Sequence, residues 1–245
     1  MKILAIGSHP DDIEYGCGGT LIRFAEQGHE VYLFVATCGN FGGSPEIRKQ
    51  EQLNAAEIIG AKEVIFGDYI DTQVPMNQEL IQRLENEINR IKPDLIFTHY
   101  PDDTHQDHRN LSTCAKSATR FVKDFLFFEG PTTQNFNPNI YVDVEEVITK
   151  KQALLSAHYS QVEKTNIKDV AITRFMESTA SFRGIKGRVK FAEGFVAVRY
   201  FLDIPDNKPA DIEVPEKFEE LIAKEIKEVK KDNFTKQTKV KQKTF

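Results

Sequence analysis

The chain has 245 residues, with 32 Lys and Arg against 37 Asp and Glu, so its formal net charge is −5. This mild acidity argues against a nucleic-acid partner or a polybasic membrane surface, because both depend on a large positive patch. Hydrophobic residues make up 40% and charged residues 28%, which is the balance of a folded, water-soluble protein. The longest apolar stretch of the first half, residues 31–36, is far shorter than the roughly 20 residues that span a bilayer. No membrane span is predicted.

The N-terminal residues and the cysteines predict a cytoplasmic protein. A secretory signal has a basic start, an apolar core and a small-residue cleavage site, whereas here the apolar residues 3–7 run directly into Asp11 and Asp12. The three cysteines are an odd number without a CxxC spacing, so they favour neither a disulfide framework nor a sulfur-rich zinc site. We therefore expect reduced thiols and a cytoplasmic location.

Short β-rich runs alternate with helical patterns through most of the chain. In chain order we expect a strand at residues 3–7, a helix at 19–27, a strand at 31–37, a helix at 46–59, a strand at 64–67, a helix at 78–91, a strand at 94–98, a helix at 107–121, strands at 125–129 and 140–144, helices at 145–157 and 169–182, and a strand at 195–201. This order predicts an α/β fold of three layers, α/β/α, around a mostly parallel, doubly wound (Rossmann-like) sheet. Residues 1–204 would form this domain, and residues 205–245 a linker, a charged helix near 217–231 and a basic tail.

Two unusual segments follow the first and the fourth predicted strands. They are SHPDD at residues 8–12 and HYPDDTHQDHR at residues 99–109, and they hold four of the six histidines. In the common strand order 3-2-1-4-5 the first and fourth strands are neighbours, and ligands bind beyond their carboxyl ends. We therefore expect the two segments to meet in space.

The side chains of these segments suit a catalytic zinc site. Imidazole and carboxylate groups, without thiolate, are typical ligands of catalytic zinc, which has three protein ligands and one open position for water. His9 and Asp12 are close enough in a tight turn to reach one ion. The third ligand would come from the second segment, where His105 and His108 are about one helical turn apart, so one can bind the ion and the other stand beside the open position. Asp11 could then accept a proton from water, whose pKa zinc lowers to about 7.

The chain resembles the PIG-L/LmbE family of zinc-dependent N-deacetylases, which act mostly on N-acetylglucosaminyl compounds. The resemblance rests on AIGSHPDDIEYGCGGTL followed about a hundred positions later by HQDHR, a specific pair of motifs in this order. Weaker similarity follows in IRKQE at 47–51, LLSAHYSQ at 154–161, FRG at 182–184 and FAEGF at 191–195. It spans about residues 1–202.

The resemblance implies a role for each residue of the paired motifs. His9, Asp12 and His108 would bind the metal ion. Asp11 would be the general base, and His105 would stabilise the tetrahedral oxyanion or protonate the leaving amine.

Further roles follow from the same resemblance. Asp107 would orient a histidine from outside the ligand set. Arg48 is similar to a family arginine that contacts substrate, and His158 and Arg183 are weaker candidates for substrate binding. Some members have a tyrosine two positions before the first His of HxDH, where this chain has Asp103, an acid that we otherwise expect to cap the following helix.

The function implied is removal of the N-acetyl group from an N-acetylated amino sugar, such as an N-acetylglucosamine compound, or from a conjugate of one. The partner would be this small molecule, with no nucleic acid and no membrane, and the family allows a homo-oligomer. Two alternatives stay open: a metal-dependent amidase acting on a non-sugar acyl amide, and a non-catalytic sugar- or metal-binding protein. A non-haem iron oxygenase also uses two His and one carboxylate, but its usual jelly-roll strands do not match this βαβ pattern.

Overall fold

The computed structural model describes residues 1–202 and residue 224. In chain order its elements are β1 (Lys2–Gly7), α1 (Asp12–Glu26), β2 (Glu30–Thr37), α2 (Pro45–Ile59), β3 (Glu63–Tyr69), α3 (Gln78–Ile91), β4 (Leu95–His99), α4 (Gln106–Ala118), β5 (Asp124–Phe128), β6 (Ile140–Asp143), the 3₁₀ helix η1 (Glu145–Val147), α5 (Ile148–Ser156), α6 (Ile172–Gly187) and β7 (Ala192–Arg199). Apart from residue 224, the linker, helix and tail expected at 205–245 lie outside the described residues.

The strands form one sheet in the order β3-β2-β1-β4-β5-β7-β6. The first five of these are parallel, and β7 is antiparallel to both β5 and β6. The prediction of a mostly parallel, doubly wound sheet with the central order 3-2-1-4-5 is therefore confirmed. β1 and β4 are neighbours at the point where the strand order reverses, which is where this class of sheet binds ligands.

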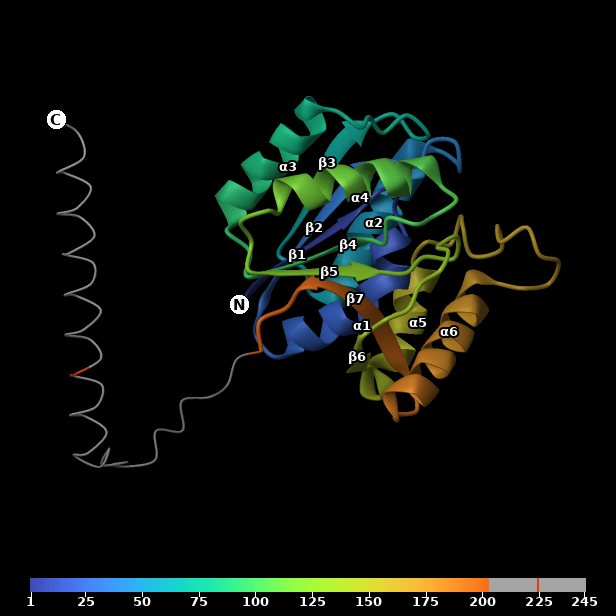
Figure 1. Ribbon diagram of the computed structural model, residues 1–245. Helices are drawn as coiled ribbons and strands as arrows, with labels where there is room; N and C mark the ends of the chain where they lie inside the picture. The colour runs from blue at the N-terminus through green and yellow to red at the C-terminus, as the bar shows by residue number, and fades with distance from the viewer. Residues whose placement is uncertain (203–223, 225–245) are drawn as a thin grey trace, which may run out of the picture. The chain divides into compact units, whose positions relative to one another are not determined.

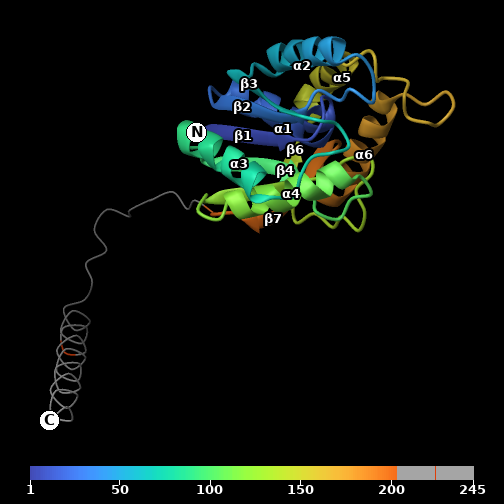
Figure 2. The same ribbon diagram turned by 90° about the horizontal axis from the view of Figure 1, so that it is seen from above.

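Helices cover both faces of the sheet, as Figures 1 and 2 show: α3 and α4 lie on one face, and α1, α2 and α5 on the other. Strand β1 lies between the two helical layers and contributes side chains to the hydrophobic core on each face of the sheet. Ile3 and Ala5 of β1 pack with α1 and α2, whereas Leu4 and Ile6 pack with α3 and α4. A strand that is buried on both faces has a continuous run of apolar residues, which explains why β1 is apolar from Ile3 to Ile6.

Helix α1 begins at Asp12, seven residues before the start predicted at residue 19. The predicted start was wrong because glycine disfavours a helix interior, and Gly16 and Gly18 precede residue 19. Close packing overrides that propensity here. A Cβ added at Gly16 would lie 2.2 Å from the ring of Phe128, so the helix can approach the sheet this closely only with glycine there. The early start places the HPDD turn directly at the helix N-terminus.

Later elements differ from the prediction at their ends. The helix expected at 145–157 is divided into η1 and α5. The helix expected at 169–182 runs instead from Ile172 to Gly187, where Arg188 in the left-handed region (φ 64°) ends it. Strand β7 begins at Ala192, three residues before the predicted start, because it pairs along its first residues with β6.

A buried ion pair fixes the middle of α1. Lys151 of α5 and Glu193 of β7 form a salt bridge with both side chains 3% exposed. The carboxylate of Glu193 accepts hydrogen bonds from the backbone N–H groups of Gly19 and Thr20, each 2.8 Å long, and Lys151 donates to the carbonyl of Tyr15. The two charges and these backbone groups satisfy one another, so the helix that carries part of the candidate site is held by α5 and β7.

Glu193→Gln should lower the free energy of unfolding by about 3–5 kcal/mol, because it leaves the Lys151 ammonium buried without its counter-charge. For a chain of this size we expect the melting temperature to fall by roughly 6–20 °C, measured by circular dichroism. Glu26→Gln is the matched control, since Glu26 pairs with Lys150 at a site where the two side chains are 44% and 58% exposed. It should cost less than about 1 kcal/mol. Equal melting temperatures for the two variants would contradict the stabilising role of the buried ion pair between Lys151 and Glu193.

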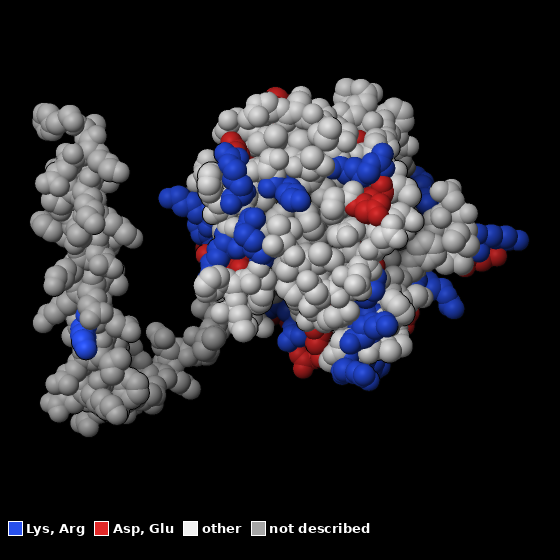
Figure 3. Space-filling model, viewed as in Figure 1, with Lys and Arg blue, Asp and Glu red and all other residues white. Residues whose placement is uncertain are grey.

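Surface charge is mixed on the face seen in Figure 3, where Lys and Arg side chains lie in several separate groups with Asp and Glu between them. None of the described helices is both long enough and apolar enough to cross a membrane.

Candidate metal centre

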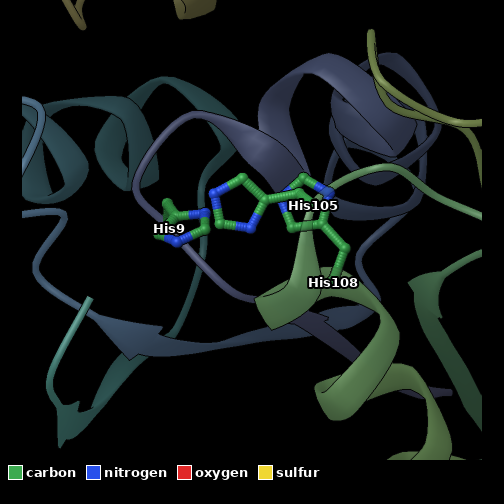
Figure 4. Close-up of side chains that lie close together, drawn as sticks. All are labelled: His9, His105 and His108. Atoms are coloured by element: carbon green, nitrogen blue, oxygen red, sulfur yellow. The ribbon is translucent and has the colours of Figure 1, made fainter. Parts of the chain in front are cut away.

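The two segments predicted to meet do so at the carboxyl edge of the sheet. β1 pairs in parallel with β4, and His9 lies in the turn that follows β1. His105 is the N-cap of α4, and His108 lies in the first turn of that helix. Figure 4 shows the three imidazoles close together. Each offers a nitrogen within 4.8 Å of the others, so residues about a hundred positions apart could share one ion.

Asp12 lies between the two histidines with which it was predicted to bind metal. Its Oδ2 atom is 3.2 Å from Nδ1 of His9, and its Oδ1 atom is 3.3 Å from Nε2 of His108. The side chains of all three residues are at most 9% exposed. The structure therefore brings His9, Asp12 and His108 together with one nitrogen of each imidazole facing the same carboxylate.

The second ring nitrogen of His9 faces two other carboxylates. Nε2 is 3.1 Å from Oδ2 of Asp107 and 3.0 Å from Oδ1 of Asp71. Asp107 is itself fixed, because it accepts hydrogen bonds from the backbone N–H groups of Thr72 (2.7 Å) and Val74 (3.1 Å). A carboxylate behind a histidine sets which nitrogen carries the proton and leaves the other free for a metal. Asp107 is thus placed to orient His9.

The imidazole of His108 is enclosed on all sides. It stacks on His99 at 4.0 Å between ring centroids and on His105 at 4.7 Å. Nε2 faces Asp12, and Nδ1 lies 3.3 Å from Oδ2 of Asp103. Both nitrogens are buried, and neither has a hydrogen-bond partner among the described residues. Buried polar atoms in proteins normally form a hydrogen bond. A buried imidazole nitrogen without one is therefore suited to bind a metal ion.

The electrostatics of the cluster favour a cation. Burial lowers the pKa of His9, but Asp107 and Asp12 outweigh it and hold the pKa well above its usual value. Burial also lowers the pKa of His108, and Asp12 and Asp103 again outweigh it and raise the pKa to about 9. The pKa of Asp12 is held well below its usual value, because nearby imidazoles outweigh the effect of burial. Carboxylates that stabilise positive charge at this position would also stabilise a divalent ion.

His99 lies against the cluster but is not free to bind a metal through Nε2. That atom accepts a hydrogen bond of 3.0 Å from the backbone N–H of Ser8. Burial is the main cause that lowers the pKa of His99 to about 4, so its ring is neutral near pH 7. In this structure it is a packing partner of His108.

His105 is placed as a hydrogen-bond donor beside the ligand set. Its Nδ1 atom accepts a hydrogen bond of 3.2 Å from the backbone N–H of Asp107, so the proton of the neutral ring lies on Nε2. Burial lowers the pKa of His105, and the charges of His9 and His108 lower it further. A neutral imidazole with an Nε2–H group can donate to a developing oxyanion.

Asp11 occupies a turn in the left-handed region, with φ 97°. Its side chain is 28% exposed and lies 3.1 Å from Nη2 of Arg48. Burial raises the pKa of Asp11 to about 6, although Arg48 opposes the shift. Arg48 also donates to the carbonyls of Pro10 (2.6 Å) and Gly39 (3.0 Å), so it holds this turn in place. Contact of Arg48 with substrate stays a prediction.

The two weaker candidates for substrate binding form contacts outside the cluster. Nε2 of the buried His158 is 3.6 Å from the carboxylate of Glu14. Arg183 donates two hydrogen bonds of 2.6 and 2.7 Å to Glu129, which follows β5. Their roles in binding substrate stay predictions.

Two carboxylates of the site were missed by sequence reasoning. Asp71 follows β3 at the same edge of the sheet as the paired motifs, and that position is the signal that could have identified it. Asp103 was expected to cap α4, but the N-cap is His105, and Asp103 instead accepts a hydrogen bond of 2.8 Å from the backbone N–H of His105. Its contact with His108 comes in addition.

Comparison with known proteins now decides the family. Residues 4–119 match the family model described as PIG-L: GlcNAc-PI de-N-acetylase. The uncharacterized deacetylase YaiS of Escherichia coli (strain K12) is 38% identical over 167 residues, which are 64% of this chain and 90% of that protein. The chain belongs to the PIG-L family. The resemblance drawn from the paired HPDD and HQDH motifs is confirmed.

Two other similar proteins extend the comparison. Diacetylchitobiose deacetylase of Thermococcus kodakarensis is 26% identical over 186 residues, which are 65% of this chain and 70% of that protein. The crystal structure of the conserved protein TT1542 from Thermus thermophilus matches with a TM-score of 0.75 and 26% identity, over 84% of this chain and 98% of that chain. The structural likeness thus extends beyond residues 4–119, and the prediction of a three-layer α/β fold is confirmed.

Proposed function

We propose that this PIG-L protein is a zinc-dependent N-deacetylase that removes the acetyl group from an N-acetylated amino sugar or a conjugate of one. The observation that carries the proposal is the convergence of His9, Asp12 and His108 at the carboxyl edge of β1 and β4. Family membership supports the reaction, and the relative named diacetylchitobiose deacetylase supports the substrate class. A cytoplasmic location and a homo-oligomer stay predictions.

We propose zinc because of the types of ligand atom that the site offers. His9, Asp12 and His108 offer two imidazole nitrogens and a carboxylate, without a thiolate, which suits catalytic zinc with one open position. The buried Nε2 atom of His108, which has no hydrogen-bond partner among the described residues, supports the same assignment. A bound zinc ion would supply a Lewis acid that polarises the amide carbonyl and makes water a stronger acid.

The remaining residues would move protons and hold charge. Asp11, with a carboxylate at the edge of the cluster and a raised pKa, would accept a proton from the attacking water. The Nε2–H group of His105 would donate to the oxyanion that forms on the acetyl carbonyl. The departing nitrogen must gain a proton, since an amide anion is a very poor leaving group. Asp11 would return the proton that it took from water, or His105 would supply one of its own. The products are acetate and a free amine.

The test is release of acetate by the full chain from N-acetylglucosamine, diacetylchitobiose and GlcNAc-PI, with acetate and free amine measured together. We expect equal amounts of the two products. Removal of the metal with a chelator should lower the rate by at least about 1000-fold, since a metal contributes several kcal/mol to the transition state. Addition of zinc should restore the rate.

The other results of this test favour the alternatives. Release from non-sugar acyl amides alone would favour a metal-dependent amidase. Saturable binding of sugar or metal, without turnover of any amide by the zinc-loaded protein, would favour a binding protein.

A further inference from the structure

Asp103 is a buried acid that the proposed reaction does not use directly. It lies between β4 and α4, and its side chain is 0% exposed. Its Oδ1 atom accepts hydrogen bonds from the backbone N–H of His105 at 2.8 Å and from the hydroxyl of Thr132 at 2.7 Å. Its Oδ2 atom accepts a hydrogen bond of 2.8 Å from the hydroxyl of Thr133. Because His105 itself caps α4, these three hydrogen bonds do not cap the helix and serve to hold the carboxylate in place.

The loop after β5 is built onto this carboxylate. The backbone N–H of Thr104 donates to the carbonyl of Thr132 at 3.1 Å, and Asp103 forms a β-bridge with Thr133. The two threonine hydroxyls therefore reach Asp103 from a segment about 30 residues further along the chain. Side-chain and backbone contacts together fix where its carboxylate lies.

The count of acceptor positions on Asp103 leaves one for His108. An ionised carboxylate has about four acceptor positions and no donor. Three are occupied by His105, Thr132 and Thr133. The unfilled position is on Oδ2, the atom that lies 3.3 Å from Nδ1 of His108. An acceptor at this place favours a proton on Nδ1, and the neutral ring then has its lone pair on Nε2, which faces Asp12.

We propose that Asp103 is a positioning residue that keeps His108 in the tautomer with the proton on Nδ1 and with Nε2 free to bind the metal ion. The inference rests on the proposed function, because it takes His108 as a metal ligand. His99 and His105 fix the plane of the His108 ring by stacking, and Asp103 fixes which of its two nitrogens has the proton. Carboxylates behind metal-bound histidines generally act in this way.

The test compares Asp103→Asn with Asp102→Asn. The amide of Asp103→Asn can turn an NH₂ group toward Nδ1 of His108 and so favour the proton on Nε2, the wrong tautomer for a ligand. We expect its zinc affinity, measured by competition with a chelator, to fall about 10- to 100-fold. Asp102→Asn is the matched control, because Asp102 is exposed and its side chain accepts a hydrogen bond from Asn135. Its zinc affinity should equal that of the wild type.

A spectroscopic measurement on the wild type does not depend on how the variants fold. In zinc-loaded protein with ¹⁵N-labelled histidine, long-range ¹H–¹⁵N correlation should show His108 with the proton on Nδ1 and zinc on Nε2. Zinc on Nδ1 would overturn the inference, as would an unchanged zinc affinity of folded Asp103→Asn. If the wild type binds zinc and releases acetate while Asp103→Asn matches it, the role of Asp103 fails alone. If the wild type binds no zinc, the proposed function fails as well.

Discussion

Asp12→Ala should remove both the metal and the hydrolytic activity. The carboxylate of Asp12 is the group toward which the imidazoles of His9 and His108 each turn a nitrogen. We expect the zinc affinity to fall by more than about 100-fold, since even residues that only support a ligand are worth 10- to 100-fold. The value of kcat/KM should fall by at least about 1000-fold, because the metal's contribution to the transition state is several kcal/mol.

Zinc content per chain, measured on protein purified without chelator, and acetate release are the two readouts. Asp102→Ala is the matched control, because Asp102 lies in the same segment between β4 and α4 but contacts Asn135 instead of the cluster. Circular dichroism of both variants separates loss of metal from loss of fold. An Asp12→Ala protein that is folded and still binds zinc as the wild type does would remove Asp12 from the ligand set.

The meeting of the two motifs could be predicted from the sequence because it depends on strand order alone. In a doubly wound sheet β1 and β4 are adjacent, so whatever follows these strands lies at one edge. Strand order alone was therefore enough to predict that His9 and His108 lie close together. The spacing of His105 and His108 likewise placed both at the start of one helix, where the structure has them.

The carboxylates behind the histidines could not be assigned in the same way. Asp71 comes from a third segment, after β3, and its contact with His9 depends on the path of a loop that has no periodic pattern. Asp103 was read as a cap because its neighbours in sequence begin a helix. Its contact with His108 depends on hydroxyls from the loop after β5, which local sequence does not reveal.

The start of helix α1 could not be predicted either, because here tertiary packing overrides helix propensity. Propensity places Gly16 and Gly18 before the predicted start of the helix at Gly19, whereas the structure has all three glycines inside it. A Cβ at Gly18 would lie 2.5 Å from Leu154, and one at Gly19 would lie 2.9 Å from Val144. Tertiary packing therefore sets where the helix begins, and only the three-dimensional structure contains that information.

Asp11→Asn should lower kcat by about 100- to 10,000-fold, the usual contribution of a positioned general base. The zinc affinity should change little, because the carboxylate of Asp11 contacts Arg48, whereas the nitrogens of His9 and His108 turn to Asp12. Asparagine is the informative replacement: it has the same shape and tolerates the left-handed backbone, here φ 97°. The turn should therefore survive while the proton acceptor is lost.

The decisive comparison is between Asp11→Asn and Asp12→Ala, two neighbours in one turn. Acetate release and zinc content should separate them, since the first variant should keep zinc and lose turnover and the second should lose both. KM for the first variant should stay within a few-fold of the wild type, because a base used in the chemical step contributes to the transition state and not to ground-state binding. Full activity in zinc-loaded Asp11→Asn would exclude Asp11 as the base and leave His105, whose ring lies 4.7 Å from that of His9, as the group that moves the proton.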